Sequence, residues 1–211
     1  MDTPHQIDSV KLDVAINKYF VGSILNAAGY PFSRDHWKNI ITTIQTKALS
    51  GGSKVPILYG IDAIHGANYT IGSTLFPQQI ALAATWNPTL VEEAASITAY
   101  DVSASGIPWN FSPVLDLARQ PLWGRFYETF GEDVYLAKTM GKAFIRGYQG
   151  EDVKHPHKVA ACLKHYVGYS FPLSGKDRTP AWIPNRILKE YLSLIHISEP
   201  TRRYAISYAV F

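Results

Sequence analysis

The sequence predicts an α/β domain built on a parallel sheet. Helical and strand-like segments alternate along the chain, the strand-like segments are apolar without alternation, and long connections follow them at 62–79, 116–131 and 165–185. Unbroken apolar runs are typical of parallel strands that helices cover on both faces. The chain has 211 residues, of which 46% are hydrophobic and 18% charged, enough for one domain with a substantial core.

In the first half of the chain, apolar residues near a 3.6-residue period predict helices over 12–25 and 34–50. Ser33 is a suitable N-cap for the second of these helices. The apolar run 55–59 predicts a strand buried on both faces, and 80–84 predicts a second, weaker strand.

The second half of the chain continues the alternation. It predicts a helix over 88–105, a strand over 109–115, a helix over 132–148, a strand over 159–163 and the start of a helix over 186–191. Asn87 with Pro88, and Glu132 with Asp133, are typical of helix starts because they cap the free N–H groups or oppose the helix dipole.

Composition excludes several classes of partner. Lys and Arg number 20 and Asp and Glu 17, so the net charge is +3, and no basic run concentrates it. Nucleic acid is therefore not expected as a partner. No membrane is expected either, since no stretch approaches the roughly 20 apolar residues of a span. The single cysteine, Cys162, excludes a disulfide framework, and the polar start MDTPHQIDSV indicates a protein that is not exported or whose beginning is missing.

Charged side chains follow three of the predicted strands. They are Asp62 and His65 after the first, Asp116, Arg119 and Arg125 after the third, and Lys164 and His165 after the fourth. Because parallel strands end at one edge of a sheet, we expect a shared polar pocket there. The alternative is that each charge forms only a local ion pair.

Such a pocket would combine the acceptor Asp62 with the donors Arg125, Lys164 and His165. This mixture suits a neutral, polyhydroxylated ligand, because each hydroxyl both donates and accepts hydrogen bonds. A phosphate is less expected, since the sequence contains no glycine-rich phosphate-binding motif. Asp62 and His65 could reach one metal ion, but no set of three ligands completes a site, so we expect neither metal nor cofactor.

Five segments together resemble the catalytic barrel of glycoside hydrolase family 3. They are VPILYGIDAIHG, TLFPQQIALAATWN, NFSPVLDLARQPLWGRFYETFGED, KVAACLKHYVGYS and SGKDRTPAW. The resemblance runs from about residue 10 to Tyr191 and is nearest to secreted or lysosomal β-glucosidases. It implies an incomplete (β/α)8 TIM-type barrel, a β-glucoside or β-glucan substrate, and a secreted or lysosomal location.

Carried over by residue, the resemblance implies that four side chains bind the sugar at the non-reducing end: Asp62, Arg125, Lys164 and His165. It further implies that Trp123 packs in the same motif, that Glu128 pairs with a nearby cation, and that Arg178 shapes the rim. One departure is Val134, where the family often has proline, and this change concerns helix initiation rather than chemistry.

The family's nucleophilic Asp and its acid/base residue lie on later segments, and neither can be matched here. Retaining glycosidases need two carboxylates about 5 Å apart. We therefore expect a fragment of a retaining β-glucosidase or exo-β-glucanase, with no catalytic residue of its own and inactive when alone. The alternatives are a non-catalytic carbohydrate-binding barrel and a metal-dependent barrel hydrolase.

The last twenty residues break the preceding pattern. Leu192 to Arg202 resembles one translated frame of a transposase adaptor used in DNA sequencing libraries, and Ile206 to Phe211 resembles a translated flow-cell adaptor. We therefore expect a partial barrel domain over 1–191 and an artefactual tail over 192–211, and we assign no function to His196 or Ser198.

Overall fold

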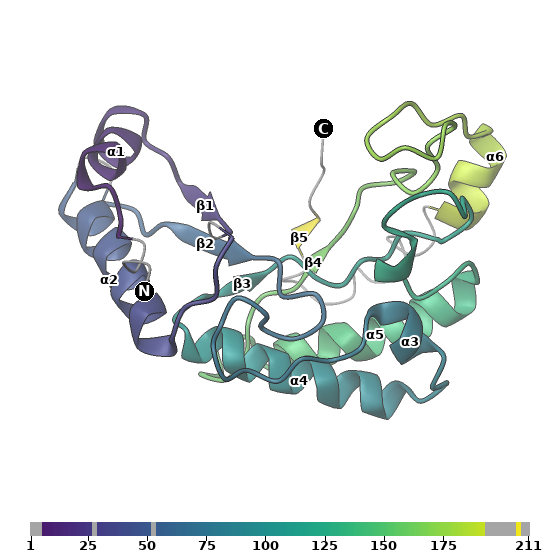
Figure 1. Ribbon diagram of the computed structural model, residues 1–211, viewed down its shortest axis with the longest axis horizontal. Coiled ribbons are helices and arrows are strands. Elements are labelled where there is room, and N and C mark those ends of the chain that lie inside the picture. Colours follow the sequence, from purple (N-terminus) through teal and green to yellow (C-terminus); the bar gives the residue numbers. More distant parts are fainter. Residues whose placement is uncertain (1–5, 27–28, 52–53, 193–205, 208–211) are drawn as a thin grey trace.

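The computed structural model describes residues 6–26, 29–51, 54–192 and 206–207. Its sheet is parallel, with the order β1 (Ser23–Leu25), β2 (Leu58–Ile61) and β3 (Trp109–Asn110). Two isolated parallel bridges, Trp109 with Ala160 and Val114 with Lys164, connect the segment of β3 to the segment that contains the next strand, β4 (Cys162–Leu163). β4 also pairs in parallel with β5 (Ile206–Ser207). Figure 1 shows these strands side by side, with helices covering one side of the sheet.

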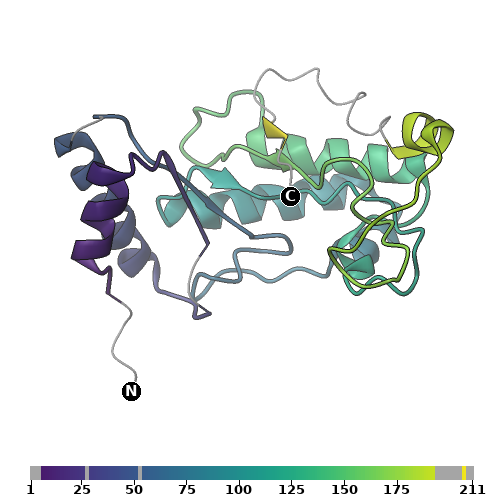
Figure 2. The same ribbon diagram turned by 90° about the horizontal axis from the view of Figure 1, so that it is seen from above.

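Helices fill the connections between the strands. They are α1 (Ser9–Asp13), a π-helical turn (Val14–Lys18), α2 (Arg34–Ser50), α3 (Gln79–Ala83), α4 (Pro88–Ala104), a 3-10 turn (Phe126–Glu128), α5 (Val134–Gln149), α6 (Asn185–Ile187) and a final π-helical turn (Leu188–Leu192). Figure 2 shows α4 and α5 running alongside each other, apart from the pair formed by α1 and α2. No helix of the described residues is long and apolar enough to cross a membrane.

Two of the three long helices, α2 and α4, begin where their capping residues predicted, and α5 begins two residues later than predicted, after Asp133. Ser33 Oγ accepts a hydrogen bond from the His36 N–H at 3.2 Å, and Asn87 Oδ1 accepts from the Thr89 N–H at 3.1 Å. Asp133 Oδ1 accepts from the Leu136 N–H at 2.7 Å. Each cap satisfies an N–H that has no partner within the helix.

The prediction of a helix over 12–25 is wrong in its second half. The helical turns end at Lys18, Phe20 has a φ of 52°, and Ser23–Leu25 forms β1. A positive φ at a bulky residue is incompatible with a continuing α-helix. The short segment instead gains sheet hydrogen bonds, because the Leu58 N–H donates to the Gly22 carbonyl at 3.0 Å.

The weaker strand predicted over 80–84 is also wrong, since Gln79–Ala83 forms α3. A short apolar run fits a buried helix as well as a buried strand. The Gln79 side chain decides between them, because its amide donates to the Val114 carbonyl at 2.9 Å and accepts from the Val114 N–H at 3.1 Å. This pair fixes α3 against the chain that follows β3.

The remaining predicted strands exist but are shorter or displaced. β2 covers Leu58–Ile61, whereas the predicted strand covers 55–59. β3 includes only the first two residues of the predicted strand 109–115, and β4 includes only the last two residues of the predicted strand 159–163. β5 lies in the segment that resembles an adaptor, most of which, 193–205 and 208–211, is outside the described residues.

Candidate functional site

A polar cavity lies just beyond the carboxyl ends of the strands. Its volume is about 330 Å³, and it is lined by Leu25, Asn26, Asp62, Phe111, Arg125, Lys164, His165, Asp177 and Arg178. The four side chains that the sequence singled out are therefore brought together around one cavity. They come from segments after β2, β3 and β4, because parallel strands deliver their carboxyl ends to the same edge.

Asp62 and Lys164 form an ion pair across this edge. Lys164 Nζ lies 2.5 Å from Asp62 Oδ1, and the Lys164 side chain is only 5% exposed, whereas that of Asp62 is 29% exposed. A lysine held out of water needs a close carboxylate to balance its charge. The greater exposure of Asp62 leaves part of its carboxylate open to the cavity.

Arg125 is held by a carboxylate three residues further along. Its Nε and Nη2 donate to the two oxygens of Glu128 at 2.9 and 2.6 Å. Burial alone would lower the pKa of Arg125, but the hydrogen bonds and charge of Glu128, together with those of Tyr169, raise it, so the guanidinium stays charged. Glu128 is thus the partner of a nearby cation, as predicted.

His165 is oriented by Asp116, and the peptide bond between Lys164 and His165 is cis. Asp116 Oδ2 accepts from both the His165 N–H at 3.0 Å and the ring Nδ1 at 2.6 Å, and both side chains are almost fully buried. The ring Nε2 lies 3.2 Å from Arg125 Nη1. Because a guanidinium can only donate, this contact requires a neutral ring with its proton on Nδ1.

A chain of hydrogen bonds links Arg125 to the cavity rim. Arg125 Nη1 donates to the Tyr169 hydroxyl at 3.0 Å, and that hydroxyl donates to Asp177 Oδ2 at 3.0 Å. Asp177 Oδ1 also accepts from Trp123 Nε1 at 2.8 Å. Burial raises the pKa of Asp177, but the bonds from Trp123 and Tyr169 and the charges of Arg125 and Arg178 outweigh it and hold the pKa below its usual value.

Other candidate residues occupy different places. His65 Nδ1 lies 3.1 Å from the Phe76 carbonyl oxygen, and Arg119 Nε donates to the Glu132 carbonyl at 3.4 Å. Neither residue lines the cavity. Trp123 is packed, as predicted, with 1% exposure, and Arg178 lies at the rim with a largely exposed side chain.

Asn26 and Asp177 are cavity residues that the sequence patterns did not indicate. Asn26 follows β1, a strand that the periodicity assigned to a helix, so no strand-end signal pointed to it. Asp177 lies inside the quoted segment SGKDRTPAW, where only its neighbour Arg178 was expected near the site. Its hydrogen-bonding partners, Trp123 and Tyr169, are not themselves at the ends of the predicted strands.

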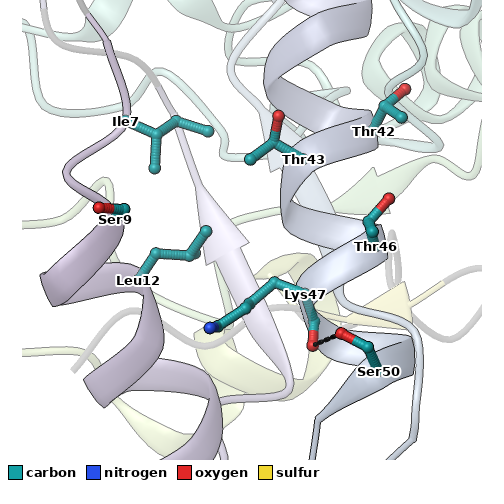
Figure 3. A pocket seen from close by; sticks show the side chains of 8 residues that line it. All are labelled: Ile7, Ser9, Leu12, Thr42, Thr43, Thr46, Lys47 and Ser50. Carbon is teal, nitrogen blue, oxygen red and sulfur yellow. Dashed lines mark hydrogen bonds between the residues drawn. The ribbon is translucent and has the colours of Figure 1, made fainter.

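A second cavity, of about 400 Å³, lies between α1 and α2. Figure 3 shows Ile7 and Leu12 pointing across it toward the helix that carries Thr43 and Lys47. The charged side chain among its described lining residues, Lys47, is paired with Asp13. This cavity therefore differs from the polar cavity, which sets cationic donors opposite carboxylates, and we place the functional site in the latter.

The polar cavity suits hydroxyl groups better than a metal ion. Within the described part of the chain, no group of three or more His, Cys, Asp or Glu side chains could hold a metal. The cavity's carboxylates already accept bonds from protein donors, Asp62 from Lys164 and Asp177 from Trp123 and Tyr169. Their remaining lone pairs can accept hydrogen bonds from the hydroxyls of a neutral ligand, and the cationic side chains beside them can donate to its oxygens.

The chain matches known proteins over most of its length. The family model for the glycosyl hydrolase family 3 N terminal domain matches residues 3–194. The lysosomal beta glucosidase of Dictyostelium discoideum is 46% identical over 200 residues, covering 88% of this chain and 24% of that protein. A beta-xylosidase of Formosa agariphila is 42% identical over 118 residues, covering 53% of this chain and 16% of that protein.

Among solved structures, an exo-1,3/1,4-beta-glucanase from a Pseudoalteromonas species superposes with a TM-score of 0.83 and 29% identity, over 93% of this chain and 26% of that one. The chain thus spans about a quarter of the length of the glucosidase and the glucanase. The parallel sheet and its covering helices are part of a TIM-barrel-like α/β fold, as predicted. On the extent of the family match and the 46% identity, this chain belongs to glycoside hydrolase family 3.

Proposed function

We propose that the chain is part of a retaining β-glucosidase or exo-β-glucanase, and that the polar cavity binds the terminal glucosyl unit at the non-reducing end. The observation that carries the proposal is the convergence of Asp62, Arg125, Lys164 and His165 on one cavity. The relative that is 46% identical over 88% of this chain is a β-glucosidase by name, which supports glucose as the sugar.

The hydrogen-bonding capacity of each side chain suggests which of them contact the sugar and which of them hold other residues in place. Lys164 has three N–H donors and directs one to Asp62, so the others can reach sugar hydroxyls. Asp62 can accept hydrogen bonds from sugar hydroxyls on its free lone pairs. Arg125 directs four hydrogen bonds to Glu128, Tyr169 and His165, so it mainly fixes those groups and contributes charge.

Hydrolysis requires more than this cavity offers. A retaining mechanism needs one carboxylate free to attack the anomeric carbon and a second to donate a proton. In the described part of the chain, the two cavity carboxylates, Asp62 and Asp177, each accept at least two bonds from protein donors. We infer that this chain alone binds the sugar without cleaving it.

Binding is the direct test. Titration of the 211-residue chain with methyl β-D-glucoside, followed by ligand-observed NMR, should show saturable binding. Asp62→Asn should weaken it about tenfold or more, because a hydrogen bond to a charged group is removed. Asp13→Asn is the matched control, since Asp13 also accepts from a lysine and an asparagine but lies outside the polar cavity.

Equal binding by wild type and Asp62→Asn would overturn the assignment of the cavity. Release of 4-nitrophenol from 4-nitrophenyl β-D-glucoside by the purified chain would overturn the inferred inactivity.

Xylose is a second candidate for the terminal sugar, because a β-xylosidase is 42% identical over 53% of this chain. Titration with methyl β-D-xyloside alongside the glucoside separates the two. We expect tighter binding of the glucoside, and the reverse order would favour the xylosidase assignment.

A further inference from the structure

Asn26 occupies a strongly determined position at the end of β1. Its backbone N–H donates to the Gly60 carbonyl at 2.9 Å, and its own carbonyl accepts from the Tyr59 hydroxyl at 2.5 Å. Its φ is 57°, in the left-handed region. These contacts hold the residue against β2, so its side chain points to the residue that follows β2, Asp62.

The Asn26 amide makes two hydrogen bonds to Asp62. Its Nδ2 donates to Asp62 Oδ2 at 2.8 Å, and its Oδ1 accepts from the Asp62 N–H at 3.0 Å. The orientation of the amide is unambiguous, because the Asp62 N–H requires an acceptor and the carboxylate requires a donor. These two hydrogen bonds extend the parallel pairing of β1 and β2 by one position, through a side chain instead of the backbone.

Asp62 is therefore held from two sides. Lys164 donates to Oδ1 and Asn26 donates to Oδ2. Without Asn26, the carboxylate could rotate to place both oxygens on the buried ammonium, which would turn its free lone pairs away from the cavity. With Asn26, one lone pair on each oxygen stays available beside a fixed donor.

We propose that Asn26 is a positioning residue for sugar binding, which fixes the Asp62 carboxylate so that its two oxygens receive two adjacent hydroxyls of the terminal sugar. This inference rests on the proposed function of the polar cavity. Asn26 also lines that cavity, so its amide is placed beside the same hydroxyls.

A purely structural role for Asn26 makes a different prediction. Asparagine, aspartate and glycine all tolerate a left-handed backbone. If the only role of Asn26 were to allow the left-handed backbone conformation, Asn26→Gly and Asn26→Asp would both bind the glucoside with wild-type affinity. If it positions Asp62, removal of the amide weakens binding, and a second carboxylate facing Asp62 Oδ2 weakens it further by charge repulsion.

The test is the affinity for methyl β-D-glucoside of the full 211-residue chain and its variants, with thermal melts in parallel. Asn26→Gly should weaken binding about tenfold, in line with loss of one hydrogen bond to a charged group. Asn26→Asp, which keeps the side-chain shape, should weaken it more. Lys54→Gly is the matched control, because Lys54 has a φ of 54°, is exposed and lies outside the cavity lining.

Equal affinities of wild type and Asn26→Gly would overturn the inference. If Asn26→Gly failed to fold, Asn26→Asp with wild-type affinity would overturn it in the same way. Loss of binding in Asp62→Asn together with unchanged binding in both Asn26 variants would reject the role of Asn26 and leave the proposed function standing. Absence of any glucoside binding by wild type would overturn the proposed function, and this inference with it.

Discussion

His165 receives its orientation from a carboxylate 49 positions earlier in the chain. Asp116 accepts from both its backbone and its ring, and the ring then presents Nε2 to Arg125. A neutral histidine in one tautomer is thus fixed in a site that is largely shielded from solvent. The same principle applies to Arg125, which Glu128 holds by two parallel bonds.

Asp116→Asn should therefore reduce stability. The amide oxygen in the place of Oδ2 can still accept both bonds from His165, but it carries no charge, and hydrogen bonds to a neutral acceptor are weaker than hydrogen bonds to a carboxylate. We expect a loss of about 1–3 kcal/mol in the free energy of unfolding. Urea denaturation measures it, and Asp152→Asn on the exposed surface is the control. An unchanged midpoint would contradict the role of Asp116.

The lowered pKa of Asp177 predicts how the stability of the fold depends on pH. A carboxyl whose folded pKa lies below the unfolded value of 3.8 stabilises the fold above that value, and loses its contribution as pH falls through the folded pKa. Asp177→Asn should thus be less stable than wild type near neutral pH. The difference should shrink as the pH is lowered below 3.8, as urea unfolding at several pH values would show.

A difference between wild type and Asp177→Asn that stayed constant from neutral pH to well below 3.8 would contradict this prediction. Glu151→Gln, at an exposed position beyond α5, provides the control for general effects of charge on the pH profile.

At the scale of elements, α4 and α5 depend on a close approach. A Cβ added at Gly147 would lie 2.3 Å from the Glu92 carbonyl oxygen and 2.6 Å from the Ala95 Cβ. Arg146 and Glu92 form an ion pair at 2.9 Å across the same contact. Glycine therefore sets the distance between these two helices.

Gly147→Ala should destabilise the protein, although alanine favours helices by about 1 kcal/mol relative to glycine. The clash is with backbone, which cannot move without separating α4 from α5, and overpacking of this kind costs about 1–3 kcal/mol. Gly141→Ala, also in α5, should cost less, because its added Cβ meets the tip of the Leu115 side chain. Thermal melts of both variants test the order, and a more stable Gly147→Ala would contradict it.

At the scale of the whole molecule, β1 ends the strand order β1-β2-β3 in the described part of the chain. Apolar side chains are exposed on and around it, with Phe20 at 61%, Leu25 at 54% and Val55 at 57%. Edge strands with exposed apolar residues pair readily with other chains. The barrel architecture normally removes such edges by closing on itself.

We therefore expect the 211-residue chain to self-associate at micromolar concentration. Leu25→Lys should reduce the associated fraction, because a charge on an edge strand opposes strand pairing. Sedimentation velocity measures both, with Leu49→Lys on the exposed side of α2 as the control for added charge. A monomeric wild-type chain with a cooperative melt would contradict the expectation.

The sequence by itself determined the helices that begin at Arg34, Pro88 and Val134, because their capping residues act within three positions of the first turn. It also determined that charged groups follow the buried strands, and the motifs that carry the family resemblance. These features are local, so short stretches of residues decide them.

Tertiary structure alone decided the identity of β1, the helical state of α3 and the pairing inside the cavity. Asp62 accepts hydrogen bonds from Asn26, 36 positions earlier in the chain, and from Lys164, 102 positions later. The Gln79 side chain, in the first turn of α3, is hydrogen-bonded to the backbone of Val114, 35 positions later in the chain. The physical reason is that a short apolar segment has no strong preference of its own, and a buried polar group takes whichever partner the packing of distant segments supplies.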